Sequence, residues 1–394
     1  MKKSKSKNLL SQFKKVFNEV SKNINNSEKT ISILNKDFKF SLKLKELKKF
    51  KRFKTIALIG MGGSILGAEA INNFLENKIS KKVYFFNDLN ESKILDFKKR
   101  EKISNVLFII ISKSGNTIET LSNAFLLNVF KKNSKNVIII SERKNNLLFN
   151  ISKNFNLFHI AHNEYVGGRY SVLSEVGIIP AYLMGANIFK LRHKIRDCLS
   201  AKKRASLRNN TIKMAKFIRS KKTNNLIFLN YAPELEKFLY WYQQLIAESL
   251  GKKNKGFLPV ISNVPKDHHS LLQLYLDGPR DKFFAIFTCE DKSINTIDVK
   301  SEIFKKNVFN KKKFSTIKSA QKNALIKAFK NKNIPFREFK IKKNNEETLG
   351  KLFAYFILET ILIGKLVNIN PFNQPAVEVV KNFTKQLLNQ RHQK

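Results

Sequence analysis

The sequence predicts an α/β fold with two doubly wound parallel sheets, flanking helices and a C-terminal helix. Short apolar segments alternate with segments of helical period along most of the 394 residues, and the alternation starts again in the second half. One segment, 106–112 (VLFIIIS), is continuously apolar, as expected for a strand that a parallel sheet buries on both faces. A chain of this length can form two such units.

Each predicted strand is a short apolar run that ends in a turn or loop. In the first half we expect strands at 55–60, 83–87, 106–112, 137–141 and 157–160, and helices at 64–77, 92–100 and 117–130. In the second half we expect strands at 226–231, 257–262, 283–288 and 335–341, and helices at 233–250, 270–276, 319–329, 347–367 and 376–389.

Two further segments flank these units. The basic N-terminal segment carries an apolar stripe at helical spacing from Leu9 to Val20, which indicates a docking helix. We therefore expect an N-terminal helical segment at 1–50, a first α/β domain at 51–200, a second at 201–370 and a C-terminal helix at 371–394.

The net charge of +45 is the unusual feature of the composition. Such a charge fits binding to nucleic acid or acidic lipid, but it also fits a coding sequence rich in A and T. The second interpretation is favoured because lysines occur from Lys2 to Lys394 rather than in one segment, and because 34 Phe accompany one Trp and 14 Gly. We expect no nucleic-acid partner.

Cysteine usage and hydropathy limit the class of protein further. Cys198 and Cys289 are too few for a disulfide scaffold or a four-cysteine zinc site, and with no HExxH motif no metal is expected. The first 25 residues lack an apolar signal region, and the most apolar stretch, 352–367, carries Glu359 and Lys365. We therefore expect a cytoplasmic protein that does not associate with membranes.

Four of the 14 glycines fall in one octet, 60–67 (GMGGSILG), between a predicted strand and a predicted helix. Backbone N–H groups in such a turn can converge on an anion, assisted by the helix dipole. The dinucleotide fingerprint fails because position 65 is Ile, and the Walker A pattern fails because Ala-Glu follows Gly67. A tight turn without a ligand remains an open alternative for this octet.

A second loop, 112–117 (SKSGNT), brings hydroxyl groups to the end of another predicted strand. Ser112, Ser114 and Thr117 supply three hydroxyls within six residues, just before a helix. An N-cap role for Ser114 or Asn116 would explain only one of these groups. The pattern favours a pocket for a compact phosphate monoester.

These two loops resemble the phosphosugar-binding loops of sugar isomerase (SIS) domains. Four more segments make the chain similar to the glucose-6-phosphate isomerase family: 166–180 (VGGRYSVLSEVGIIP), 248–252 (ESLGK), 269–273 (HSLLQ) and 370–381 (NPFNQPAVEVVK). The motifs follow the family's order, and the similarity runs from about residue 55 to 381. It implies two SIS-like domains that interconvert glucose 6-phosphate and fructose 6-phosphate through a cis-enediol, without a metal or an organic cofactor.

The resemblance also implies roles for individual residues. Glu248 matches the catalytic base, Arg169 the stabiliser of the enediolate, and Lys381 the lysine that acts near the ring oxygen. His269 matches the ring-opening acid/base, which the partner subunit contributes in this family, so a homodimer is implied. The positions that match the phosphate and substrate contacts are Gly63, Ser64, Ser112, Lys113, Ser114, Thr117, Gln244 and Gln374.

The sequence departs from the family pattern at Asn373 and Ala376, where Asp and Gly are usual. Two alternatives to a simple isomerase stay open. A bifunctional isomerase that also accepts mannose 6-phosphate would share these loops. A non-catalytic sugar-phosphate sensor would keep the serine loops but would not need Glu248, Arg169 and His269 together.

Overall fold

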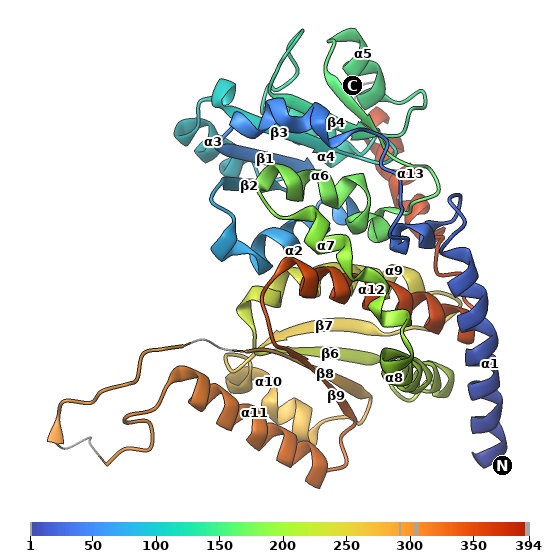
Figure 1. The fold of residues 1–394 in the computed structure, drawn as a ribbon, viewed down its shortest axis with the longest axis vertical. Coiled ribbons are helices and arrows are strands. Elements are labelled where there is room, and N and C mark those ends of the chain that lie inside the picture. Colours follow the sequence, from blue (N-terminus) through green and yellow to red (C-terminus); the bar gives the residue numbers. More distant parts are fainter. Residues whose placement is uncertain (1, 291–292, 303–305, 391–394) are drawn as a thin grey trace.

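The structure is a computed structural model that describes residues 2–290, 293–302 and 306–390, and it contains two parallel sheets (Figure 1). The strand order is β2-β1-β3-β4-β5 in the first sheet and β7-β6-β8-β9 in the second. Every strand pair of both sheets is parallel. The predicted α/β fold with two doubly wound parallel sheets is confirmed.

The first sheet is apolar on both faces. Its strands are β1 (Thr55–Gly60), β2 (Lys82–Phe86), β3 (Val106–Ile111), β4 (Val137–Ser141) and β5 (Phe158–Ala161). Its helices are α2 (Leu66–Phe74), α3 (Glu91–Arg100), α4 (Ile118–Leu126) and α5 (Leu147–Asn154). Alternate residues of β1 enter different cores: Ile56 packs on the side of α2, and Ala57 on the side of α3 and α4. The six residues of β3 are all buried, as its apolar run predicted.

The second sheet repeats the arrangement of the first. Its strands are β6 (Asn225–Asn230), β7 (Leu258–Asn263), β8 (Lys282–Cys289) and β9 (Phe336–Ile341). Its helices are α9 (Glu236–Leu250), α10 (His268–Asp277), α11 (Phe314–Asn331) and α12 (Glu346–Leu366). Strands β6 and β8 occupy the central positions that β1 and β3 occupy in the first sheet. Helix α11 begins at Phe314, five residues before the predicted residue 319.

A layer of helices lies between the two sheets and joins them (Figure 1). Helix α2 packs against α9, and α9 packs against α12. One continuous apolar core contains Ile56 of β1, Phe228 of β6, Leu245 of α9 and Ile361 of α12. The two sheets therefore share a core rather than forming separate bodies.

The connection from the first sheet to the second crosses this middle layer. Its elements are the 3₁₀ segment η6 (Gly168–Leu173), α6 (Glu175–Met184), α7 (Ile188–His193) and α8 (Ala201–Ser220). Helix α6 packs on α2, and α7 and α8 pack on α12. The expected domain boundary at residue 200 falls at the start of α8 and stays a prediction.

The two terminal helices differ in how they pack. Helix α1 (Lys2–Asn23) lies along α12 and buries Leu9, Phe13, Phe17 and Val20. Helix α13 (Ala376–Gln390) buries none of its residues. Its exposed apolar side chains are Val377, Val379, Val380, Phe383, Leu387 and Leu388. In the described part of the chain, no helix is both long and apolar enough to cross a bilayer.

Glu359, a charge within the apolar sequence of α12, is fully buried and pairs with Arg337 of β9. Arg337 donates to Glu359 at 2.7 Å and to the hydroxyl of Tyr242 at 2.9 Å. Tyr242 and Tyr355 in turn donate to the Glu359 carboxylate at 3.3 and 3.2 Å. This network ties β9, α9 and α12 together, and its charges are stable only as a pair.

We predict that Arg337→Met lowers the free energy of unfolding by about 3–5 kcal/mol, because it leaves Glu359 charged and buried without its partner. Arg100→Met is the matched control, since Arg100 pairs with Asp96 at 2.9 Å on the exposed face of α3. The control is expected to change the free energy of unfolding by at most about 0.5 kcal/mol. Urea unfolding measures both changes, and equal effects would contradict the prediction.

Candidate active site

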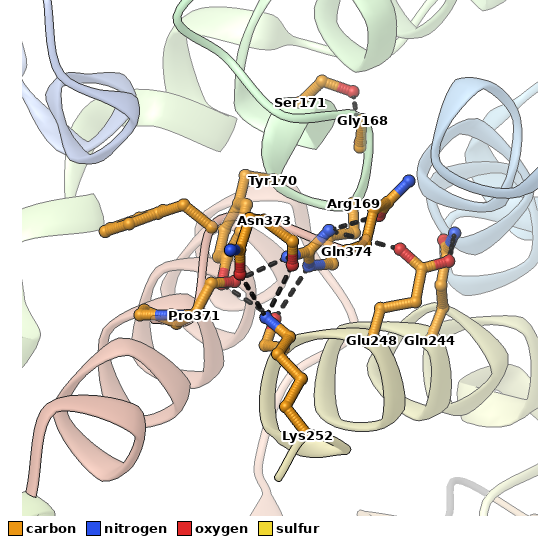
Figure 2. A network of polar contacts seen from close by, with 12 residues as sticks. Gly168, Arg169, Tyr170, Ser171, Gln244, Glu248, Lys252, Pro371, Asn373 and Gln374 are labelled. Carbon is orange, nitrogen blue, oxygen red and sulfur yellow. Dashed lines mark hydrogen bonds and ion pairs between the residues drawn. The ribbon is translucent and has the colours of Figure 1, made fainter. Parts of the chain in front are cut away.

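Arg169 lies in η6, in the layer between the two sheets, and its guanidinium is buried with all five N–H donors matched (Figure 2). A guanidinium removed from water requires such a complete set of acceptors. The donors reach Ser249 Oγ (2.8 Å), Glu248 Oε2 (3.3 Å), Gln374 Oε1 (2.6 Å) and the carbonyl oxygens of Pro371 (2.5 Å) and Asn373 (3.1 Å). Arg169 thereby joins η6, α9 and the segment before α13.

Helix α9 presents Gln244 and Glu248 on one face, one turn apart. Gln244 Nε2 donates to Glu248 Oε1 at 2.8 Å, while Glu248 Oε2 faces Arg169. The Glu248 side chain remains 27% exposed, whereas that of Arg169 is 2% exposed. The carboxylate is therefore fixed from two sides and is still accessible to a ligand.

The glycine octet, 60–67, lies against both α9 and η6. Gly62 has φ +52°, and a Cβ added there would lie 2.7 Å from Gln244 Nε2. A Cβ added at Gly63 would lie 2.2 Å from the carbonyl carbon of Gly168. Only glycine permits this close approach, which sets Ser64 and the start of α2 beside Arg169 and Gln244.

Loop 112–117 lies next to the octet because β1 and β3 are neighbours in the sheet. Gly60 pairs with Ile111, so the two loops leave the same edge where the strand order reverses, the usual ligand site of such sheets. The Ser112 and Thr117 hydroxyls lie 2.8 Å apart. Lys113 Nζ donates to the carbonyl oxygen of Glu164 at 2.7 Å.

Neither Ser114 nor Asn116 caps helix α4. Its N-cap residue is Thr117, whose side chain makes no capping hydrogen bond. Asn116 Oδ1 accepts instead from the backbone N–H of Leu147 at 2.9 Å, and Ser114 Oγ accepts from the N–H of Asn116 at 3.4 Å. The first N–H groups of α4 therefore receive no side-chain acceptor at the N-cap.

Two of the predicted catalytic residues lie apart from this cluster. His269 is exposed in the first turn of α10. Lys381 is exposed on α13 and pairs with Glu378 at 2.8 Å. Neither side chain forms a hydrogen bond or ion pair with Arg169 or Glu248 within the described part of this single chain.

Lys252, which follows Glu248 by one turn, belongs to the site although the sequence analysis assigned it no role. Its Nζ donates to the carbonyl oxygens of Asn370 (2.6 Å) and Asn373 (2.5 Å) and approaches Asn373 Oδ1 at 3.2 Å (Figure 2). Burial and the nearby charge of Arg169 lower the pKa of Lys252 to about 8, although Glu248 acts in the opposite direction. The only sequence signal for Lys252 was its place in the ESLGK motif.

A cavity of about 790 Å³ opens beside Glu248. It is lined by the end of α9, by the turn at 251–255 and by residues of the segment 369–377, including Gln374. Across the residues that the structure describes, no three His, Cys, Asp or Glu side chains gather as a metal site would require.

Comparisons with known proteins agree with this architecture. The family profile described as Phosphoglucose isomerase matches residues 7–262. A probable glucose-6-phosphate isomerase of Methanococcus maripaludis is 35% identical over 86% of this chain and 79% of its own length. The glucose-6-phosphate isomerase of Methanocaldococcus jannaschii is 32% identical over 90% of this chain and 89% of its own.

Solved structures share the fold at lower identity. A hypothetical protein from Thermus thermophilus aligns with a TM-score of 0.81 and 22% identity, over 95% of this chain and 94% of that one. A glucose-6-phosphate isomerase from Chlamydia trachomatis aligns with a TM-score of 0.71 and 18% identity, over 88% and 72%. With a profile that matches well over half of its residues, and with these relatives, the chain belongs to the phosphoglucose isomerase family.

Proposed function

We propose that this chain interconverts glucose 6-phosphate and fructose 6-phosphate by moving a proton between C2 and C1 of the open-chain sugar. Its family supports this activity, and two of its relatives carry the name of this enzyme. The observation that carries the proposal is the Glu248 carboxylate, held between Arg169 and Gln244 and partly open to a cavity. Such a carboxylate has the position and access that a general base needs.

The reaction passes through a cis-enediol. Glu248 takes the proton from C2 of the aldose and returns it to C1, while the hydroxyl proton passes from O2 to O1. Negative charge develops on those oxygens during the transfer. The Arg169 guanidinium, fixed 3.3 Å from Glu248, supplies positive charge that does not have to reorient at that moment.

The phosphate group of the substrate binds at the switch point of the first sheet. The uncapped start of α4 supplies backbone N–H donors, and Ser112 and Thr117 supply paired hydroxyls. The further contacts are Gly63, Ser64, Lys113 and Ser114. Binding the remote phosphate holds C1 and C2 against Glu248, which lowers the entropic part of the barrier.

Gln244 recognises a sugar hydroxyl. Its Nε2 is engaged by Glu248, but its buried Oε1 has no hydrogen-bond partner among the described residues. A buried acceptor of this kind is satisfied when a ligand hydroxyl donates to it. Gln374, which accepts a hydrogen bond from Arg169 at 2.6 Å, also contacts the substrate.

The working enzyme is a cytoplasmic homodimer that acts in sugar-phosphate metabolism without a cofactor. His269 is exposed here, so it is available to a second copy of the chain for ring opening. The apolar side chains of α13 also need cover, and packing against a partner would carry Lys381 with them.

We predict that Glu248→Gln lowers kcat by about 10²–10⁴-fold, because the amide cannot take the C1 proton of fructose 6-phosphate and deliver it to C2. KM for fructose 6-phosphate should change less than about threefold, since the phosphate contacts remain. A coupled assay that forms glucose 6-phosphate in the presence of EDTA measures both constants. Glu236→Gln, at the other end of α9, is the control and should match the unmodified protein. Retained turnover in Glu248→Gln would remove this residue as the base.

We predict that the double variant Ser112→Ala, Thr117→Ala raises KM about 10–100-fold with a smaller change in kcat, because two hydroxyl contacts to the phosphate are lost together. Both hydroxyls are removed together because a single substitution would leave the other hydroxyl without its hydrogen-bond partner. Ser104→Ala, exposed just before the opposite end of β3, is the control. An unchanged KM would place the phosphate elsewhere.

We predict that co-expressed His269→Ala and Glu248→Gln chains, each inactive alone, form mixed dimers with about half of normal activity, because one of the two sites in each mixed dimer combines an intact Glu248 with an intact His269. The two variants carry different tags, so that mixed dimers are purified before the assay. Purified mixed dimers without activity would contradict a site shared between subunits.

A further inference from the structure

Lys252 is the second cation that holds the segment 370–373. Its three nearest acceptors are Asn370 O, Asn373 O and Asn373 Oδ1, at 2.6, 2.5 and 3.2 Å. An ammonium group has three N–H donors and no acceptor, so the number of donors equals the number of oxygens. The match requires the charged form, because a neutral amine would turn a lone pair toward one of these oxygens.

Lys252 and Arg169 act on the same stretch of backbone. The carbonyl oxygen of Asn373 accepts from both side chains, and that of Pro371 accepts from Arg169 and from the Tyr170 hydroxyl at 2.9 Å. Figure 2 shows Lys252 reaching this segment from the end of α9, on the side away from Gln244. The segment is thus held from η6 by Arg169 and Tyr170 and from the end of α9 by Lys252.

This segment is also the joint between the core and the last helix. Helix α12 ends at Leu366 inside the shared core, and α13, which begins at Ala376, buries none of its residues. Gln374 follows the joint directly, and Lys381 lies further along the same helix. The positions of both residues therefore depend on how residues 370–373 are held.

We propose that Lys252 is a positioning residue of the isomerisation: its ammonium group fixes residues 370–373, so that Gln374 and the carbonyl oxygens that hold Arg169 stay aligned with Glu248. The inference rests on the proposed function for its kinetic consequences. Lys252 acts through Arg169 and Gln374 and does not itself touch the reacting atoms.

The surroundings of Lys252 lower the pKa of its ammonium group. The charged groups that face it are Arg169 from η6 and Glu248 from α9, and residues 370–373 contribute only neutral groups. Burial and Arg169 lower the pKa of Lys252 to about 8 against the raising effect of Glu248. The protonated fraction therefore falls as pH rises through about 8, and kcat should fall with it.

The test compares Lys252→Met with Lys216→Met, an exposed lysine of α8 that does not line the cavity. Both variants remove one positive charge and keep an unbranched side chain. We expect Lys252→Met to lower kcat about 10-fold or more with KM changed less than about threefold, because Arg169 is misaligned while the phosphate loops are intact. Lys216→Met should keep normal constants. Equal behaviour of the two variants would overturn the proposal.

Lys252→Arg gives the second readout, the pH dependence of kcat. The guanidinium stays charged at all working pH values, so the alkaline fall near pH 8 should move upward in this variant while activity is retained. A fall that stays at the same pH would overturn the proposal even if Lys252→Met does not fold.

Amide hydrogen exchange separates this proposal from the proposed function. Backbone amides of 370–376 should exchange faster in Lys252→Met than in Lys216→Met, whether or not the chain turns over the sugar. Unchanged exchange would overturn the positioning role. An inactive but well-folded unmodified chain would overturn the proposed function alone.

Discussion

The arrangement of the candidate site depends on the burial of one cation. Arg169 is taken out of water in the middle layer, and its five donors find five acceptors on α9 and on the segment before α13. Losing any one acceptor would leave a desolvated positive charge underbonded, which costs several kcal/mol in buried sites. The requirement to satisfy this cation therefore fixes the relative positions of three chain segments that are far apart in the sequence.

The fold supplies the rest of the site through the topology of the first sheet. A parallel sheet collects the carboxyl ends of β1 and β3 at one edge, and the chain turns from there into α2 and α4. The glycines at 62 and 63 let this edge approach α9 and η6 without side chains between them. The loops proposed to bind phosphate and the proposed proton-transfer pair are thus built on adjoining elements of the fold.

Much of the fold was predictable from local sequence patterns. The apolar run at 106–112, the clustered glycines and the hydroxyl-rich loop indicated β3, a close backbone approach and an anion site, and the resemblance placed Glu248, Arg169 and Gln244 in one site. The roles assigned to the individual site residues stay predictions. Where each sheet lies relative to the other could not be predicted, because it depends on the packing of α2, α9 and α12 rather than on any one segment.

Lys252 shows why other features stayed hidden. Its partners, Asn370 and Asn373, lie more than a hundred residues further along the chain, and lysine is common throughout this sequence. The Arg337–Glu359 pair was hidden although the two residues are only 22 positions apart, since only the fold brings β9 and α12 together. His269 and Lys381 are exposed in a single chain, so their roles depend on contacts outside it.

The continuous core between the two sheets limits how a sugar enters and leaves. Two domains with separate hydrophobic cores can move apart by a hinge motion. Here such a motion would divide one packed apolar core and expose both parts of it to water. The end of α9, which lines the cavity, belongs to this packed core and has little room to move. Movement is left to the rim, formed by the turn at 251–255 and the exposed last helix, so ligand exchange is governed by a few peripheral residues and not by the body of the protein.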